Sequence, residues 1–215
     1  MVGSQSYLRA TELAGRILHE SGVSAFPLNP VFLARQAGVK IVPYAQFAAL
    51  SALREEELLA VSEDGFSTCV DSQYFIVYNP AVQPRSRRRW TLLHEYCHIR
   101  LGHVPEGGAL LPGGPNERAL EAAADELTAC LIAPLPLAFL CRIEGEEALA
   151  RCFGLSGRAA ANIFRDYQTY RRSSLSPALG YGEALGFFCR FAMDYLRRQE
   201  REASRRHYRM VDIDA

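Results

Sequence analysis

The chain has 215 residues, which is long enough for one substantial hydrophobic core or for one domain with an appendage. Apolar residues make up 49% and charged residues 22%, a balance that is typical of globular proteins and excludes a disordered chain. The formal net charge at pH 7 is zero, so the whole chain is not a polycation that binds nucleic acid through bulk charge.

The compartment is indicated by what the sequence lacks. The N-terminal residues contain no apolar run of the signal-peptide type, and we find no stretch of about 18 apolar residues to span a membrane. The 6 cysteines are scattered without a CxxC pair, so a zinc site made of thiolates is not expected. We therefore expect a cytoplasmic protein with reduced, mostly buried thiols and no membrane contact.

The N-terminal part is predicted to contain two helices and a strand. Residues 4–19 have the apolar spacing of an amphipathic helix. Residues 30–37 form a second, short helix, because Pro30 favours a helix start and Gly38 a helix end. Residues 39–44 are then predicted to be a strand.

Residues 46–61 are ambiguous. They fit one helix with Leu50, Leu53 and Leu58 packed inward, and the acidic residues 55–57 are interpreted as a solvated turn. After them, residues 65–70 and 73–78 are two β-rich runs on either side of Asp71-Ser72, which predicts a hairpin.

Four arginines in residues 84–89 lead into the next helix. They are interpreted as a solvated helix start in preference to substrate contacts. Thr91 is the expected N-cap of the helix and Gly102 its end. A loop rich in glycine and proline follows, and a further helix is predicted to begin near Asn116 and to end at the prolines 134 and 136.

The stretch WTLLHEYCHIRLGH contains the residues that are candidates for metal binding and catalysis. His94 and His98 are four residues apart, so on a helix they share one face and can bind one Zn²⁺, with Glu95 beside them. By chance this pattern should arise in roughly one of a hundred such chains. The alternative interpretation is a core helix with two incidental histidines.

A catalytic zinc site needs a third protein ligand. The spacing HExxHxxGxxH is absent, and His103 falls one residue short of it, so His103 is not expected to be a ligand. Glu121 and Asp125 lie four residues apart on the following helix with only alanines between them. Glu121 as ligand and Asp125 as the hydrogen-bond partner of a ligand histidine fit this spacing. Glu117 and Glu126 are the rival carboxylates.

The segments WTLLHEYCHIRLGH and EAAADELTACLIAP together resemble the ImmA/IrrE family of zinc metallopeptidases. The family motifs are aromatic-Thr-Leu-x-HExxH and ExxA(N/D)xxxxxLLxP, and the likeness covers roughly residues 5–170. It implies an α+β fold, a mostly helical zincin-like core of the gluzincin type with a small β-sheet. Tyr96-Cys97 and Thr128 depart from the usual family residues, which bears on packing more than on chemistry.

By this resemblance, His94, His98 and Glu121 would bind one Zn²⁺ per chain, and Glu95 would be the catalytic residue. Bound zinc makes water a nucleophile at neutral pH, and a carboxylate can take up its proton and deliver it to the leaving amine. Two imidazoles and a carboxylate suit zinc, although they do not exclude manganese.

A second donor for the oxyanion remains open. The candidates for oxyanion or substrate contact are Tyr74, Tyr78, His103 and Arg100. Residues 73–78, if they lie at the sheet edge, would bind the substrate as an added strand.

The domain organisation is predicted as a metallopeptidase core in residues 1–136, a helix-turn-helix-like region in residues 137–172, and a linker with a basic helix in residues 173–215. In the helix-turn-helix-like region, Ser156 caps a second helix, whose Arg158, Asn162 and Arg165 are of a kind that reads bases. The alternative is a pair of packing helices, which we favour. The basic end of the last helix contains Arg197, Arg198, Arg201, Arg205, Arg206 and Arg209.

Two functions follow. The first is a zinc endopeptidase that, by resemblance, cleaves a helix-turn-helix transcriptional repressor and so relieves the repression of stress, mobile-element or phage genes. The second is a regulatory protein that binds DNA or a repressor, contacts DNA through its C-terminal region, and keeps a structural or vestigial zinc site.

Overall fold

The computed structural model describes residues 4–109, 116–173 and 184–211, and in the last helix it describes side chains up to residue 201. In chain order the elements are α1 (Gln5–Glu20), α2 (Pro30–Gln36), β1 (Lys40–Pro43), α3 (Tyr44–Ser51), α4 (Glu55–Val61), β2 (Gly65–Val70), β3 (Gln73–Tyr78), α5 (Arg85–Arg100), α6 (Glu117–Ile132), α7 (Leu135–Leu140), α8 (Glu146–Phe153), α9 (Gly157–Arg172) and α10 (Ala184–Val211). The protein is therefore mostly helical with a small sheet, an α+β fold as predicted.

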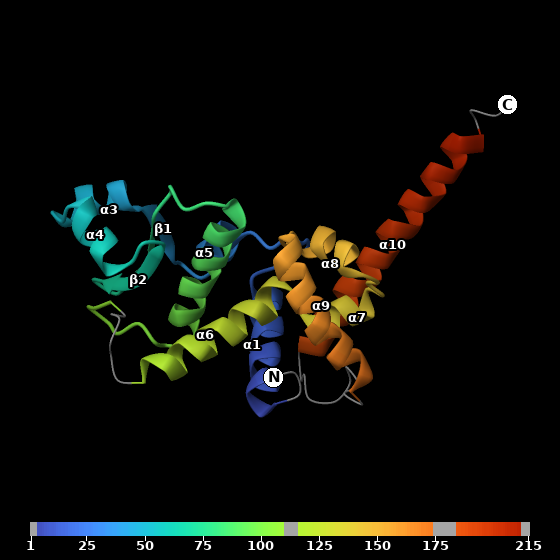
Figure 1. Ribbon diagram of the computed structural model, residues 1–215, viewed down its shortest axis with the longest axis horizontal. Helices are drawn as coiled ribbons and strands as arrows, with labels where there is room; N and C mark the ends of the chain where they lie inside the picture. Colours follow the sequence, from blue (N-terminus) through green and yellow to red (C-terminus); the bar gives the residue numbers. More distant parts are fainter. Residues whose placement is uncertain (1–3, 110–115, 174–183, 212–215) are drawn as a thin grey trace.

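The elements are arranged along one long axis (Figure 1). The sheet with α3 and α4 lies at one end, and α7, α8, α9 and α10 lie at the other. Between them run α1, α5 and α6, and the end of α10 projects away from the rest of the chain. The two helices with the histidines and carboxylates thus occupy the middle of the molecule.

The sheet has the strand order β1-β3-β2, with β1 parallel and β2 antiparallel to β3. The hairpin of β2 and β3 has the predicted bounds, and Asp71 and Ser72 both have positive φ (49° and 61°), as a two-residue type I′ turn requires. Because β3 is the central strand, the expectation that residues 73–78 lie at the sheet edge is wrong. The edge strands are β1 and β2.

The two faces of the sheet are covered by different helices, because successive side chains of a strand point to opposite faces. Ile76 belongs to the main core, which also takes in α1, α5 and α6. Its neighbour Val77 belongs to a smaller core beneath α3 and α4 with Val42, Tyr44 and Phe66. The sheet is thereby held between α5 and the α3–α4 pair.

Residues 46–61 do not form one packed helix. They form α3 and α4, in which Leu58 is buried, whereas Leu50 is 72% exposed and Leu53 is 45% exposed. The acidic residues 55–57 form the first turn of α4 and not a solvated turn. The positive end of the helix dipole favours carboxylates at this position.

Helix α5 begins at Arg85, so Thr91 is not its N-cap. The Thr91 hydroxyl instead donates to the carbonyl of Arg87, one turn earlier in the same helix. The arginines of the first turns are also more than a solvated start: the Arg87 guanidinium lies 2.9 Å from the Asp64 carboxylate, and Arg89 donates to the Phe153 carbonyl at 2.9 Å. These contacts hold the first turns of the helix to the residue before β2 and to the end of α8.

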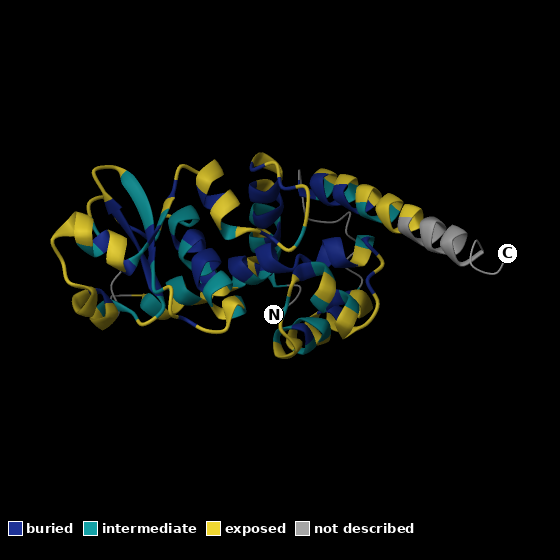
Figure 2. Cartoon of the chain, turned by 90° about the horizontal axis from the view of Figure 1, so that it is seen from above, coloured by how far each residue is buried: buried dark blue, intermediate teal, exposed yellow. Residues whose placement is uncertain are grey.

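Helix α6 is the central element of the core and packs against α1 and α5. Among the described residues, one stretch, Glu117–Leu140, has the length and hydropathy of a membrane-spanning helix, which differs from our expectation. It comprises α6 and α7, and 67% of its most apolar window is buried inside the protein. This burial is that of a core helix, and Figure 2 shows buried segments running through the molecule from the sheet at one end, through the central helices, to the start of the last helix.

The predicted helix pair α8 and α9 is present. Gly154 has a φ of 63° in the turn, and the Ser156 hydroxyl accepts from the backbone N–H of Ala159, as an N-cap does. Both helices contribute to the main core, through Phe153 and Tyr167 among others. The division at residue 136 stays a prediction, and the expected linker falls largely outside the described residues.

Gly15 lets α1 and α10 approach closely. A Cβ atom at this position would overlap with Ala184 and touch Phe188, both on α10. We expect Gly15→Ala to lower the free energy of unfolding by about 1–3 kcal/mol, the usual cost of overpacking, and to increase protease cleavage around α10.

Gly157→Ala is the matched control, because a Cβ atom there meets nothing within 4 Å. It should change the free energy of unfolding by less than about 1 kcal/mol. Equal effects of the two substitutions in urea denaturation would contradict close packing of α1 and α10 at Gly15.

Candidate metal centre

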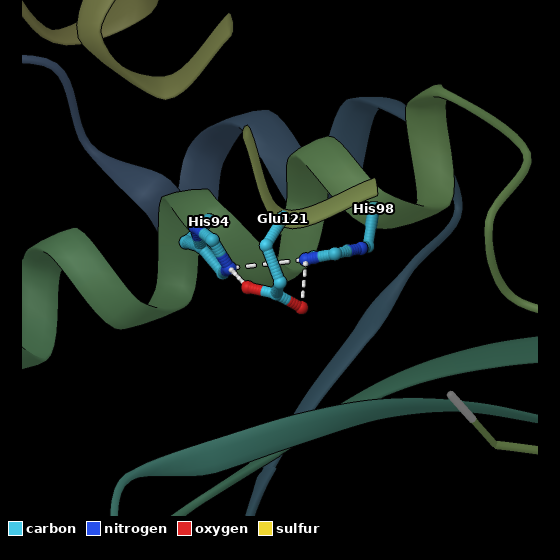
Figure 3. A group of neighbouring side chains, drawn as sticks. All are labelled: His94, His98 and Glu121. Carbon is cyan, nitrogen blue, oxygen red and sulfur yellow. Dashed lines mark hydrogen bonds and ion pairs between the residues drawn. The ribbon is translucent and has the colours of Figure 1, made fainter. Parts of the chain in front are cut away.

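Helices α5 and α6 bring His94, His98 and Glu121 together, as Figure 3 shows. His94 Nε2 lies 3.0 Å from Glu121 Oε2 and 3.0 Å from His98 Nε2. His98 Nε2 lies 3.4 Å from Glu121 Oε1. Two nitrogens and a carboxylate therefore converge on one point from two helices.

The three groups fit a metal ion. A tetrahedral zinc site with ligands at about 2.0–2.1 Å places neighbouring ligand atoms about 3.3 Å apart, close to the separations found here. The two Nε2 atoms also face each other at 3.0 Å, so in the absence of an ion one ring donates a hydrogen bond to the other, and with both nitrogens free of hydrogen their lone pairs can bind one cation. The group of His94, His98 and Glu121 could therefore hold a divalent ion.

Asp125 lies behind His94, one helical turn after Glu121. Its Oδ1 atom is 3.1 Å from His94 Nδ1, which is within hydrogen-bonding distance. The direction of approach is not that of a hydrogen bond, and Nδ1 is left without such a partner. The Asp125 carboxylate is 59% exposed, so it is free to rotate into line with Nδ1. The structure thus puts Asp125 where a carboxylate would orient a ligand imidazole.

His103 contacts His98 on the side of the ring away from His94, and its predicted contact with an oxyanion or substrate stays a prediction. Its Nδ1 atom is 3.0 Å from His98 Nδ1, the nitrogen opposite the one that faces His94. Burial, followed by the neighbouring His94 and His103, lowers the pKa of His98 from 6.5 to about 3. His98 is therefore neutral at pH 7, as a metal-binding imidazole must be.

Glu95 is held by the sheet. The Ser67 hydroxyl on β2 donates to Glu95 Oε2 at 2.8 Å, and Ser67 is fully buried. Burial raises the pKa of Glu95 from 4.5 to about 7, while the hydrogen bonds from Ser67 lower it. Sequence reasoning missed Ser67, since nothing in the pattern of β2 indicates which of its residues faces α5.

The remaining candidates lie in different places. Arg100 donates to the Tyr96 hydroxyl at 3.1 Å and approaches Glu20 at 3.7 Å, so it is not directed at the metal-binding group. Tyr74 and Tyr78 lie on the central strand β3 and pack against the main core, on the same face of the sheet as Ile76. Their role in binding an oxyanion or substrate stays a prediction.

The rival carboxylates lie outside the group. Glu126 accepts a long hydrogen bond of 3.4 Å from Ser6 on α1, and Glu117 is not among the residues whose ligand atoms converge. The 6 cysteines are free thiols, and Cys69, Cys97, Cys130 and Cys141 are buried, as predicted.

Comparison with known proteins agrees with the geometry. A sequence model of the peptidase family M78, described as the IrrE N-terminal-like domain, matches residues 51–163. This segment is more than half of the chain and contains the sheet residues of β2 and β3, all of α5 and α6, and both groups of candidate ligands. A search of curated proteins gave no match.

Glu121→Gln tests the third ligand. We expect the protein to bind one divalent ion and this variant to bind it more than about 100-fold more weakly, because an amide is a much poorer ligand than a carboxylate. Metal content after dialysis and isothermal titration with Zn²⁺ measure the effect. Glu117→Gln and Glu126→Gln are the controls and should bind like the wild type. If either control lost the ion while Glu121→Gln still bound it, the third ligand would be that other carboxylate and not Glu121.

Proposed function

The chain belongs to the peptidase family with the IrrE N-terminal-like domain, and on that basis we propose that it is a zinc-dependent endopeptidase. The observation that supports this most strongly is the convergence of His94, His98 and Glu121 with Glu95 alongside. A structural zinc site would be closed by four protein ligands. Here, among the described residues, three converge, the number of protein ligands in a catalytic zinc site that keeps its fourth position for water.

The residues divide the chemistry between them. His94, His98 and Glu121 would hold the zinc ion, which when bound makes water a nucleophile at neutral pH and polarises the carbonyl group. Glu95 would take the proton from the attacking water and deliver it to the leaving amine. Ser67 keeps the Glu95 carboxylate in place through the 2.8 Å hydrogen bond and so reduces the reorganisation that proton transfer requires.

The edge of β2 is the proposed binding surface for the peptide backbone. Near its end, β2 is already paired on this side, because the backbone N–H of Cys69 donates to the Gly108 carbonyl at 2.8 Å. The first half of the strand, Gly65 to Ser67, is the outer edge of the sheet next to Glu95, and it pairs with no further strand among the described residues, although the Gly65 N–H donates to the Ser62 hydroxyl at 3.1 Å. An extended substrate would add to the sheet there, with its backbone amides hydrogen-bonded to β2.

A hollow of about 580 Å³ adjoins the metal centre and offers room for substrate side chains. It shares Asp125 with the centre and is otherwise lined mainly by apolar groups, including Trp90, Leu135 and Ile163. Pockets of this size, apolar with a few polar groups, are typical of ligand sites.

For the biological substrate we propose a helix-turn-helix transcriptional repressor in the cytoplasm. Its cleavage would relieve the repression of stress, mobile-element or phage genes. The support is the likeness to the ImmA/IrrE family. The test is incubation with the repressor encoded next to this gene, with and without a chelator, read by intact mass. A repressor that stays uncleaved with zinc, while an unrelated protein is cleaved, would rule out this substrate.

Glu95→Gln tests the catalytic carboxylate. We expect zinc to stay bound, because Glu95 is not a ligand, and cleavage of the repressor to fall by about 10²–10⁴-fold, the usual contribution of a general base. Initial cleavage rates and zinc content of the same preparation give both quantities. Glu106→Gln, an exposed residue outside the centre, is the control. Cleavage at the wild-type rate by Glu95→Gln would exclude the proposed role.

DNA binding by the C-terminal region is a second candidate function. Arg158, Asn162 and Arg165 on α9 are all exposed, and their spacing places them on one face of the helix. This face is free for a partner in the way that a recognition helix requires.

If α9 binds DNA, exchange of Arg158 and Arg165 for alanine should weaken the binding of a duplex about tenfold or more, because charged contacts to phosphates are lost. Fluorescence anisotropy at 50 and 200 mM salt measures this. Arg85→Ala on α5, also exposed, is the control. Binding that does not change with either salt or the α9 exchange would exclude this function.

A further inference from the structure

The C-terminal end of α5 makes two contacts with His98, one through the backbone and one through a side chain. We infer that this helix cap, formed by Gly102 and His103, contributes to metal binding. In it, His103 orients the imidazole of His98 and fixes its tautomer, so that His98 can bind the ion. The inference depends on the proposed function only in requiring that His98 binds a metal ion.

The backbone of the cap explains how His103 comes to face His98. Gly102 has a φ of 72°, a left-handed conformation that glycine adopts without strain. Its N–H donates to the Ile99 carbonyl at 3.0 Å, and the next N–H, that of His103, donates to the His98 carbonyl at 2.9 Å. This is the Schellman pattern of helix ends, in which the chain turns back over the last helical turn. The side chain of His103 is thereby directed at the residue five positions earlier.

The geometry of the two side chains determines which nitrogen donates the hydrogen bond between them. The two Nδ1 atoms are 3.0 Å apart, and the rings are tilted by 67° with centroids 5.1 Å apart. At this distance one Nδ1 must carry the hydrogen and the other must accept it. His98 Nε2 faces His94 and Glu121, so it must be free of hydrogen to bind an ion. His98 Nδ1 therefore donates, and His103 Nδ1 accepts.

Because His98 is buried, its Nδ1–H depends on His103 for a hydrogen-bond acceptor. His98 is 1% exposed, so a water molecule from bulk solvent has little access to replace the acceptor. Without His103, His98 Nδ1–H would be left buried without a partner, and the alternative tautomer, with hydrogen on Nε2, would block ion binding. His103 thus selects the tautomer that binds metal.

The two ligand histidines are supported in different ways. His94 has a carboxylate behind it, Asp125, whereas His98 has an imidazole. A neutral imidazole fixes the orientation and tautomer of His98 without adding negative charge to a centre that already contains Glu121 and Glu95. Partners of this kind typically contribute 10–100-fold to metal affinity.

The experiment compares zinc dissociation constants of full-length wild-type protein, His103→Ala, His103→Asn and His19→Ala by competition with a chromophoric chelator. His103→Ala should bind zinc about 10–100-fold more weakly, and His103→Asn should recover much of the loss, because its amide oxygen can accept the hydrogen bond. His19 is exposed on α1, so His19→Ala is the control for loss of a histidine and should bind like the wild type.

A second measurement separates positioning from simple stabilisation. The ¹⁵N shifts of His98 in the zinc-loaded wild type should show hydrogen on Nδ1, and the metal-free variants should unfold at temperatures close to that of the metal-free wild type. Zinc affinity equal to wild type in His103→Ala, or hydrogen on Nε2 of His98, would overturn the inference. If the wild type itself binds no zinc, the metal centre fails as a whole, which is a distinguishable result.

Discussion

The close approach of α5 and α6 is the constraint on which the centre depends. Two of the three converging groups come from one helix and the third from the other, so a small separation of the axes would take Glu121 out of reach of both imidazoles. Between Glu121 and Asp125 the chain has only alanines, and Ala124 is fully buried. Small side chains allow helices to pack near the lower end of the usual 8–10 Å range. The same helix α6 also packs on α1, which fixes its position from behind.

Around this crossing, each functional group is held by a different part of the fold. The sheet supplies Ser67 to Glu95, helix α6 supplies Asp125 to His94, and the cap of α5 supplies His103 to His98. Such outer contacts determine the orientation and tautomer of the groups that do chemistry. Such outer contacts make a centre largely pre-organised, because the side chains lie close to their places before an ion or a substrate binds.

The arrangement also relates the centre to the rest of the chain. The outer edge of β2 and the hollow lined by Trp90 adjoin the centre through Glu95 and Asp125 respectively. In the function proposed above, the first would take the substrate backbone and the second its side chains. Helices α8 and α9 share the main core with α5 and α6 and are anchored to the start of α5 by Arg89. They therefore belong to the same folded body as the metal centre.

The sequence by itself determined the elements governed by local rules. The hairpin bounds follow from β-rich runs around a turn, and the facing pairs of α5 and α6 follow from the four-residue repeat of a helix. It did not determine contacts between distant segments. Sequence spacing could not place residues 73–78 in the centre of the sheet, show that arginine contacts extend α5 back to Arg85, or show that Ser67 meets Glu95. His103 depends on both local sequence and tertiary structure. Gly102 indicates that the chain reverses there, but only the structure shows that His103 reaches Nδ1 of His98. Local backbone preferences act within a few residues, whereas strand order and side-chain partners are decided by the burial of the whole chain.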